Sequence, residues 1–144
     1  MLVFIVCLLL TWLLGMGVPQ PRLPGGVIAD GLYWMLMAAA ACLLLVSQWQ
    51  FYRAGTTVNP LRPEAASRLL QSGVFAFSRN PVYLAMLLVI VAFALRQGPA
   101  SGLLGGAFFY LHLNRLQILP EERALAQRFG DEYHAYCARV RRWL

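Results

Sequence analysis

The residues best suited to chemistry lie in two short segments of a very apolar chain. The first segment runs from Leu69 to Tyr83 and contains Arg79 and Asn80, and the second begins with Glu121 and Glu122. An arginine and an amide can bind an anion, and a carboxylate can bind a cation or accept a proton. Because a chain this apolar has no structural need for so many polar groups at two bilayer entry points, we interpret the two segments as a cofactor and substrate site.

Each segment also has a purely structural interpretation. Asn80 followed by Pro81 is a typical helix start, and Tyr83 is a normal residue at a membrane surface. The acids at 121 and 122 follow Pro120, so they could serve a helix first turn through the helix dipole. His112 lies within an apolar run, where it could line a pocket or make a hydrogen bond between helices.

Composition indicates an all-α integral membrane protein. The chain has 144 residues, of which 60% are hydrophobic and 12% charged, and its apolar residues form long runs. The first run would cover roughly 25 Å as a helix, just enough for the hydrocarbon core. We expect a single membrane domain over 1–144, a helical bundle with four spans at about 2–18, 32–51, 81–95 and 102–119. Within the fourth span, Gly102 and Gly106 predict close helix packing rather than a nucleotide loop.

The distribution of arginine predicts the orientation in the membrane. All 12 basic residues are arginine, and Arg22 and Arg96 alone fall on one side of the predicted spans. By the positive-inside rule, both termini and the loop over 53–80 should be cytoplasmic, and we expect a bacterial inner membrane. The same bias explains the net charge of +6 without a nucleic-acid partner. The other arginines are Arg53, Arg62, Arg68, Arg79, Arg115, Arg123, Arg128, Arg139, Arg141 and Arg142.

The segment over 120–144 is too charged to span a membrane and predicts a cytoplasmic amphipathic helix. Gly130 should end one helical segment, and Asp131 should cap the next. The apolar stripe needs a partner, either the ends of the spans or the headgroup plane. It consists of Leu125, Phe129, Tyr133, Tyr136 or Cys137, and Val140. The three cysteines have no metal-ligand spacing, so we expect neither a disulfide nor a metal.

Taken together, these segments form a pattern: L-x-x-S-G-V-aromatic-A-x-x-R-x-P-x-Y, then an apolar hairpin, then E-E and F-G-D-E-Y-x-x-Y-x-x-R-V. This pattern, over roughly 55–144, resembles the isoprenylcysteine carboxyl methyltransferase and phospholipid methyltransferase superfamily. The matching residues are Leu69, Ser72, Gly73, Val74, Phe75, Ala76, Arg79, Pro81, Tyr83, Glu121, Glu122, Phe129, Gly130, Asp131, Glu132, Tyr133, Tyr136, Arg139 and Val140.

The resemblance implies an integral membrane enzyme that uses S-adenosylmethionine and methylates a lipophilic acceptor, a prenylcysteine-type carboxylate or another small hydrophobic molecule. An amine acceptor would have to lose a proton, and Glu121 or Glu122 is the candidate base. In the eukaryotic members an arginine precedes the substrate-facing glutamate by four residues; here Gln117 holds that position, and Arg115 is the nearest arginine. The family often has histidine at Asn80. Carried across, the cofactor-binding residues are Leu69, Leu70, Phe75, Asn80, Pro81, Val82 and Tyr83, with Arg79 shaping the turn.

Two other functions fit the same composition. One is a membrane reductase of the sterol-reductase type that uses NADPH, and the other is a small four-span transporter or accessory protein. Compact exporters commonly carry an acid within a span, and here Asp30 lies only at the edge of one. The acceptor atom, whether oxygen, nitrogen or sulfur, and the oligomeric state remain open.

Overall fold

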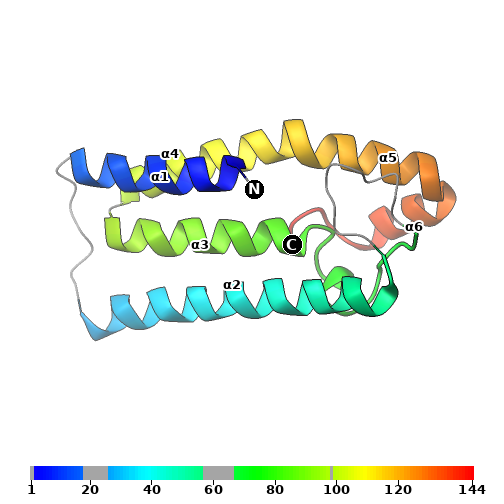
Figure 1. The fold of residues 1–144 in the computed structure, drawn as a ribbon, viewed down its shortest axis with the longest axis horizontal. Helices are drawn as coiled ribbons and strands as arrows, with labels where there is room; N and C mark the ends of the chain where they lie inside the picture. Colours follow the sequence, from blue (N-terminus) through cyan, green and yellow to red (C-terminus); the bar gives the residue numbers. More distant parts are fainter. Residues whose placement is uncertain (1, 18–25, 57–66, 98) are drawn as a thin grey trace. The chain divides into compact units, whose positions relative to one another are not determined.

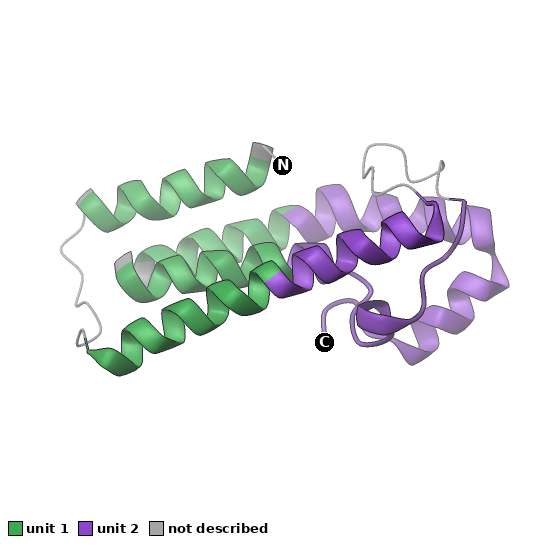
Figure 2. Ribbon diagram, turned by 60° about the horizontal axis from the view of Figure 1, so that its bottom comes forward, with its two compact units in different colours: residues 1–41, 85–112 green, residues 42–84, 113–144 purple. Residues whose placement is uncertain are grey.

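The computed structural model describes residues 2–17, 26–56, 67–97 and 99–144. Within these ranges the regular structure is helical throughout and includes no strand, which confirms the all-α prediction (Figure 1). Two of the arginines that predict the orientation, Arg22 and Arg62, lie outside the described residues. The chain divides into two compact units, one of residues 1–41 and 85–112 and the other of residues 42–84 and 113–144 (Figure 2).

The first unit is built on close packing of α1 (Leu2–Gly17) against α4 (Pro99–His112) (Figure 1). A Cβ added at Gly105 would lie 2.2 Å from Oγ1 of Thr11, so only glycine permits this approach. The buried Thr11 hydroxyl donates to the carbonyl of Cys7 at 2.8 Å, and its polar group is therefore satisfied within the apolar helix.

Gly102 brings α4 against the end of α3 (Pro81–Gln97). A Cβ at Gly102 would lie 1.8 Å from the Cβ of Ala94, which confirms the helix-packing interpretation of this glycine. Gly106 is different, since a Cβ there would meet only Cγ2 of Ile90 at an ordinary 3.9 Å. The second glycine that packing requires is thus Gly105, one position earlier than the G-x-x-x-G spacing predicts.

The helix best suited to cross a membrane is α2 (Val27–Ala54), which extends beyond the predicted 32–51 at both ends. Its 28 residues include a window of mean hydropathy 1.8, and only 6% of that window is buried within the protein. The apolar stretches Val3–Met16 and Pro81–Arg96 are helical but shorter. Within the described ranges, one helix is therefore long and apolar enough to cross a membrane, and the four-span count stays a prediction.

In the second unit, the chain passes through a wide π-helical turn, η3 (Leu113–Ile118), directly into α5 (Leu119–Phe129). Pro120 explains the wide turn, because proline has no N–H for the carbonyl of Leu116 and its ring crowds that carbonyl. Pro120 and both acids do lie in the first turn of α5, as predicted. However, Ile118 has helical φ −68° and ψ −45°, so this helix start continues a preceding turn and is not a free end.

The rest of the second unit packs around the predicted apolar stripe. Gly130, with φ 51°, separates α5 from α6 (Asp131–Arg139), which confirms the break. Asp131 is the first residue of α6 rather than its cap, because Gly130 occupies the capping position. The stripe packs largely on itself, because α5 and α6 both contribute to one cluster, to which Leu69 is added from outside these helices. Its buried members Tyr133, Tyr136 and Val140 pack with Leu69, Leu125, Ala126, Phe129 and Cys137.

Candidate active site

The segment that leads into the site is anchored by a short helical turn, η2 (Gly73–Ala76). Gly73 adopts φ 62°, a conformation that favours glycine. Phe75 is buried, its ring meets that of Phe51 edge-on at 5.1 Å, and its carbonyl accepts a 2.7 Å hydrogen bond from the hydroxyl of Tyr136. The S-G-V-F motif is therefore held by α6, far along the chain.

The turn at 78–80 is held by the extended segment that follows α6. The backbone N–H of Arg79 donates to the carbonyl of Arg141 at 3.1 Å. The carbonyl of Arg142 accepts from Nδ2 of Asn80 at 3.0 Å and from the hydroxyl of Ser78 at 3.5 Å. Asn80 precedes α3 as predicted, and the Nδ2 of its side chain binds this segment. These bonds fix the backbone from which the Arg79 side chain emerges.

Glu121 is held by two neutral donors. The hydroxyl of Tyr83 and Nε2 of Gln117 both donate to its Oε1, at 2.6 and 2.9 Å. Burial raises the pKa of Glu121 above its usual range, the hydrogen bonds from Gln117 and Tyr83 lower it in part, and the nearby charge of Glu122 raises it. Because the net shift is upward, Glu121 takes up a proton more readily than a solvent-exposed glutamate.

Glu122 is held instead by two guanidinium groups. Nη2 of Arg79 lies 3.1 Å from Oε1 of Glu122. Arg142 grips the same carboxylate with two nitrogens, Nε at 3.0 Å from Oε1 and Nη2 at 2.5 Å from Oε2. The side chains of Arg79, Glu122 and Arg142 are 14%, 17% and 33% exposed. Nη1 of Arg79 also donates to the thiol of Cys137. We call the six residues Arg79, Tyr83, Gln117, Glu121, Glu122 and Arg142 the acid–arginine cluster.

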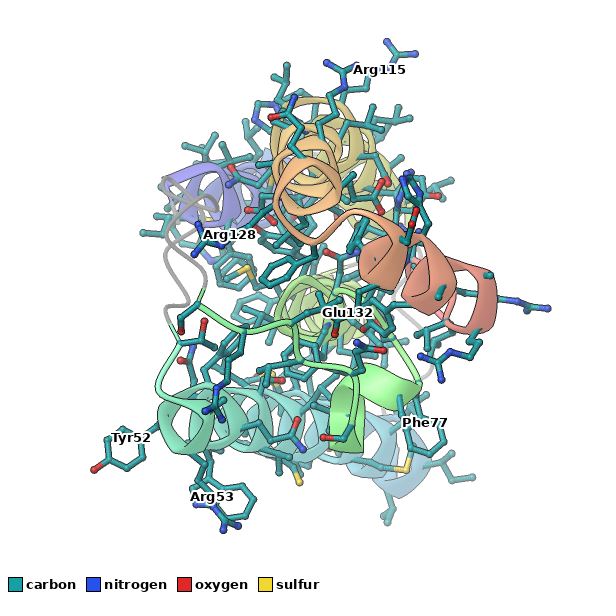
Figure 3. All side chains as sticks on the ribbon, turned by 90° about the vertical axis from the view of Figure 1, so that its right-hand side faces the viewer. Tyr52, Arg53, Phe77, Arg115, Arg128 and Glu132 are labelled. Atoms are coloured by element: carbon teal, nitrogen blue, oxygen red, sulfur yellow. The ribbon has the colours of Figure 1, made fainter. Side chains whose placement is uncertain are left out.

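Five of the residues singled out from the sequence meet in this cluster: Arg79, Tyr83, Gln117, Glu121 and Glu122. Arg115 does not join them, because its side chain is exposed and points outward from the helix (Figure 3). Gln117 and Arg115 were the two residues that could take the place of the family's substrate-binding arginine. Of these, Gln117 is the one that lies beside Glu121. The other predicted cofactor residues lie nearby in the chain and are partly or fully buried: Leu69, Leu70, Phe75, Asn80, Pro81 and Val82.

Sequence reasoning missed Arg142, which it counted only as a cytoplasmic charge. Val140 is extended, with φ −121° and ψ 126°, and it is buried. In an extended segment, residues two apart lie on the same side. The alternation Val140, Arg141, Arg142 could therefore have indicated that Arg142 faces inward and Arg141 outward.

Comparison with known proteins decides the family. A model of the family described as phospholipid methyltransferase matches residues 31–132. The chain belongs to the phospholipid methyltransferase family. Membership confirms the superfamily resemblance and indicates a membrane-associated methyltransferase. All members of the acid–arginine cluster lie within the matched residues, except Arg142.

A second comparison finds a relative without an assigned function. An uncharacterized protein of Haemophilus influenzae is 44% identical over 63 residues, which is 44% of this chain and the whole of the relative. No solved structure matches the chain.

Proposed function

We propose that the protein is an integral membrane methyltransferase that moves a methyl group from S-adenosylmethionine to a lipophilic acceptor at the acid–arginine cluster. Family membership and the apolar surface of α2 support the membrane and methyltransferase parts. The observation that carries the assignment to this site is the direct bonding of the Arg79–Tyr83 turn to Glu121 and Glu122, segments that are about forty residues apart in sequence.

The residues present suit such a cofactor. S-adenosylmethionine carries a carboxylate, an ammonium group, a sulfonium and a purine, so its site needs a cation, an acid and an aromatic wall. Arg79 supplies a buried cation whose Nε has no hydrogen-bond acceptor within the described part of the chain. Oε1 of Gln50, beside Gly73, is likewise buried and accepts no hydrogen bond there. A buried polar atom without a partner is costly, and a bound polar ligand would remove that cost.

When bound, the cofactor supplies an electrophilic methyl group. The contribution of the chain is to align the reacting groups, to exclude water and, where the acceptor must lose a proton, to accept it. Glu121 suits the last role, because its raised pKa brings it closer to the range in which a carboxylate is an effective base. A carboxylate or thiolate acceptor would need no base, and Glu121 would then orient it.

Binding experiments on the purified protein in lipid nanodiscs test this proposal. We expect calorimetry to detect binding of S-adenosylhomocysteine and no binding of NADPH. Incubation with S-adenosylmethionine labelled in its methyl group should then transfer label to a component of a lipid extract. Binding of NADPH alone would support a reductase, and binding of neither ligand would reject both enzymatic functions.

A further inference from the structure

We propose that Arg142 is a positioning residue: by gripping Glu122, it leaves Arg79 with positive charge for the carboxylate of the bound cofactor. The inference rests on the proposed function and extends it to one group of the ligand. Arg79 and Arg142 carry two positive charges and Glu122 one negative charge, so these three side chains have a formal surplus of +1, while the neighbouring Glu121 is bound by the neutral Tyr83 and Gln117. A partly buried surplus of that kind favours an anion.

Glu122 is bound more extensively by Arg142 than by Arg79. Arg142 engages both carboxylate oxygens in a fork, with Nε 3.0 Å from Oε1 and Nη2 2.5 Å from Oε2. Arg79 reaches only Oε1, through one nitrogen at 3.1 Å. Forked arginine–carboxylate pairs are the stronger arrangement. Without Arg142, Glu122 would be free to pair fully with Arg79 and cancel its charge.

Arg142 is itself firmly placed. Its carbonyl accepts from the side chains of Ser78 and Asn80, and its Nη1 donates to Oδ1 of Asn114 at 3.3 Å. Nε1 of Trp143 donates to the same Asn114 oxygen at 3.4 Å. Hydrogen bonds to its carbonyl therefore fix the backbone of Arg142, and the bond to Asn114 fixes the end of its side chain. A residue that orients another needs to be fixed at both places.

The experiment compares two ligands that differ by one group. S-adenosylhomocysteine and its decarboxylated analogue would be titrated by calorimetry into the full chain and three variants in nanodiscs. We expect Arg142→Gln to lower the affinity for S-adenosylhomocysteine about tenfold and to leave the affinity for the decarboxylated analogue unchanged. Arg142→Lys should recover part of the loss because it keeps the charge without the fork. Arg141→Gln, which removes an equal charge from an exposed neighbour, should match the wild-type chain with both ligands.

If Arg142→Gln lowered the affinity for both ligands equally, the proposal would be overturned, because Arg142 would then only support the fold. Unchanged affinity for both would overturn it as well. If Arg142→Gln does not fold, Asn114→Ala carries the test, since it loosens Arg142 without changing charge and should weaken only the ligand that has a carboxylate. A wild-type chain that binds neither ligand would reject the proposed function itself, a result distinct from these.

Discussion

Neighbouring residues on a helix point about 100° apart, and Glu121 and Glu122 take entirely different partners as a result. Glu121 accepts from the neutral Tyr83 and Gln117, whereas Glu122 neutralises part of an arginine pair. Glu121 has a raised pKa and neutral partners, so it is the better candidate for a base or an acceptor-orienting group. We expect Glu121→Gln to lower turnover on the order of a hundredfold while the affinity for S-adenosylhomocysteine is kept.

The matched change Glu122→Gln should act on stability instead. It leaves two partly buried guanidinium groups without their carboxylate, at a cost of roughly 1 to 3 kcal/mol in unfolding free energy. Its effect on turnover should be milder than that of Glu121→Gln. Methyl-transfer rates and thermal unfolding of the two variants check both statements. Equal, small effects on turnover would show that the acid pair is structural.

Tyr83 tunes Glu121 through its hydroxyl. The 2.6 Å hydrogen bond stabilises the carboxylate form and so lowers the pKa of Glu121 against the upward effect of burial. Tyr83→Phe removes that bond, and the pKa of Glu121 should then rise further. If turnover needs the carboxylate, the acidic limb of the pH–rate profile should move to higher pH. Tyr52→Phe is the control, since Tyr52 is exposed and points outward (Figure 3). A limb that does not move would mean that turnover is indifferent to the ionisation of Glu121.

At the scale of elements, η2 depends on a glycine that no other residue replaces freely. Gly73 and Gly55 have nearly the same φ, 62° and 60°, so alanine at either should cost about 1 to 2 kcal/mol. A Cβ at Gly73 would also lie 1.7 Å from Nε2 of Gln50, whereas Gly55 has open space. Gly73→Ala should therefore lose more unfolding free energy than Gly55→Ala in denaturant titrations. Equal losses would show that the contact with Gln50 yields without cost.

The wide turn η3 sets the register between Gln117 and Glu121. Pro120 favours this turn because it withholds an N–H from the preceding helix. Pro120→Ala would allow a regular helix, which should raise stability by up to about 3 kcal/mol. The change from the π-helical turn to a regular helix would also rotate Gln117 relative to Glu121, and turnover should fall about tenfold or more. Thermal unfolding and methyl-transfer rates measure the two effects. Full activity in a stabilised variant would mean that the π-helical turn is dispensable.

Local signals explain which features could be predicted from the sequence. Apolar runs predicted the helices, and Gly130 predicted the break between α5 and α6. The spacing of apolar residues by three and four positions predicted the stripe that includes Tyr133. The pairing of Arg142 with Glu122 depends on contacts between distant segments, and no local pattern specifies it. Choosing Gln117 over Arg115 required the phase of the helix at η3, which a single proline changes.

At the scale of the whole molecule, the apolar surface of α2 supports a place in a membrane, and the arginine distribution predicts which way the chain faces. The exposed side chains of α2 include Leu32, Leu45 and Trp49, which water would solvate poorly. Arg53 lies in the last turn of α2 and Arg68 follows the helix, while Arg96 is paired with Asp30 at 2.9 Å.

Four spans with cytoplasmic termini would place Gly25 and Gly98 on the far side of the membrane and Pro60 and the last residue, Leu144, in the cytoplasm. Alkaline phosphatase inserted at Gly25 or Gly98 should be active, because it matures only outside the cytoplasm. A fluorescent protein inserted at Pro60 or fused after Leu144 should fluoresce. Inactive phosphatase at both glycines would reject the four-span arrangement. Activity at only one of the two glycines would also reject four spans and would fit α2 alone, the one helix among the described residues long and apolar enough to cross a membrane, because α2 lies between the two positions.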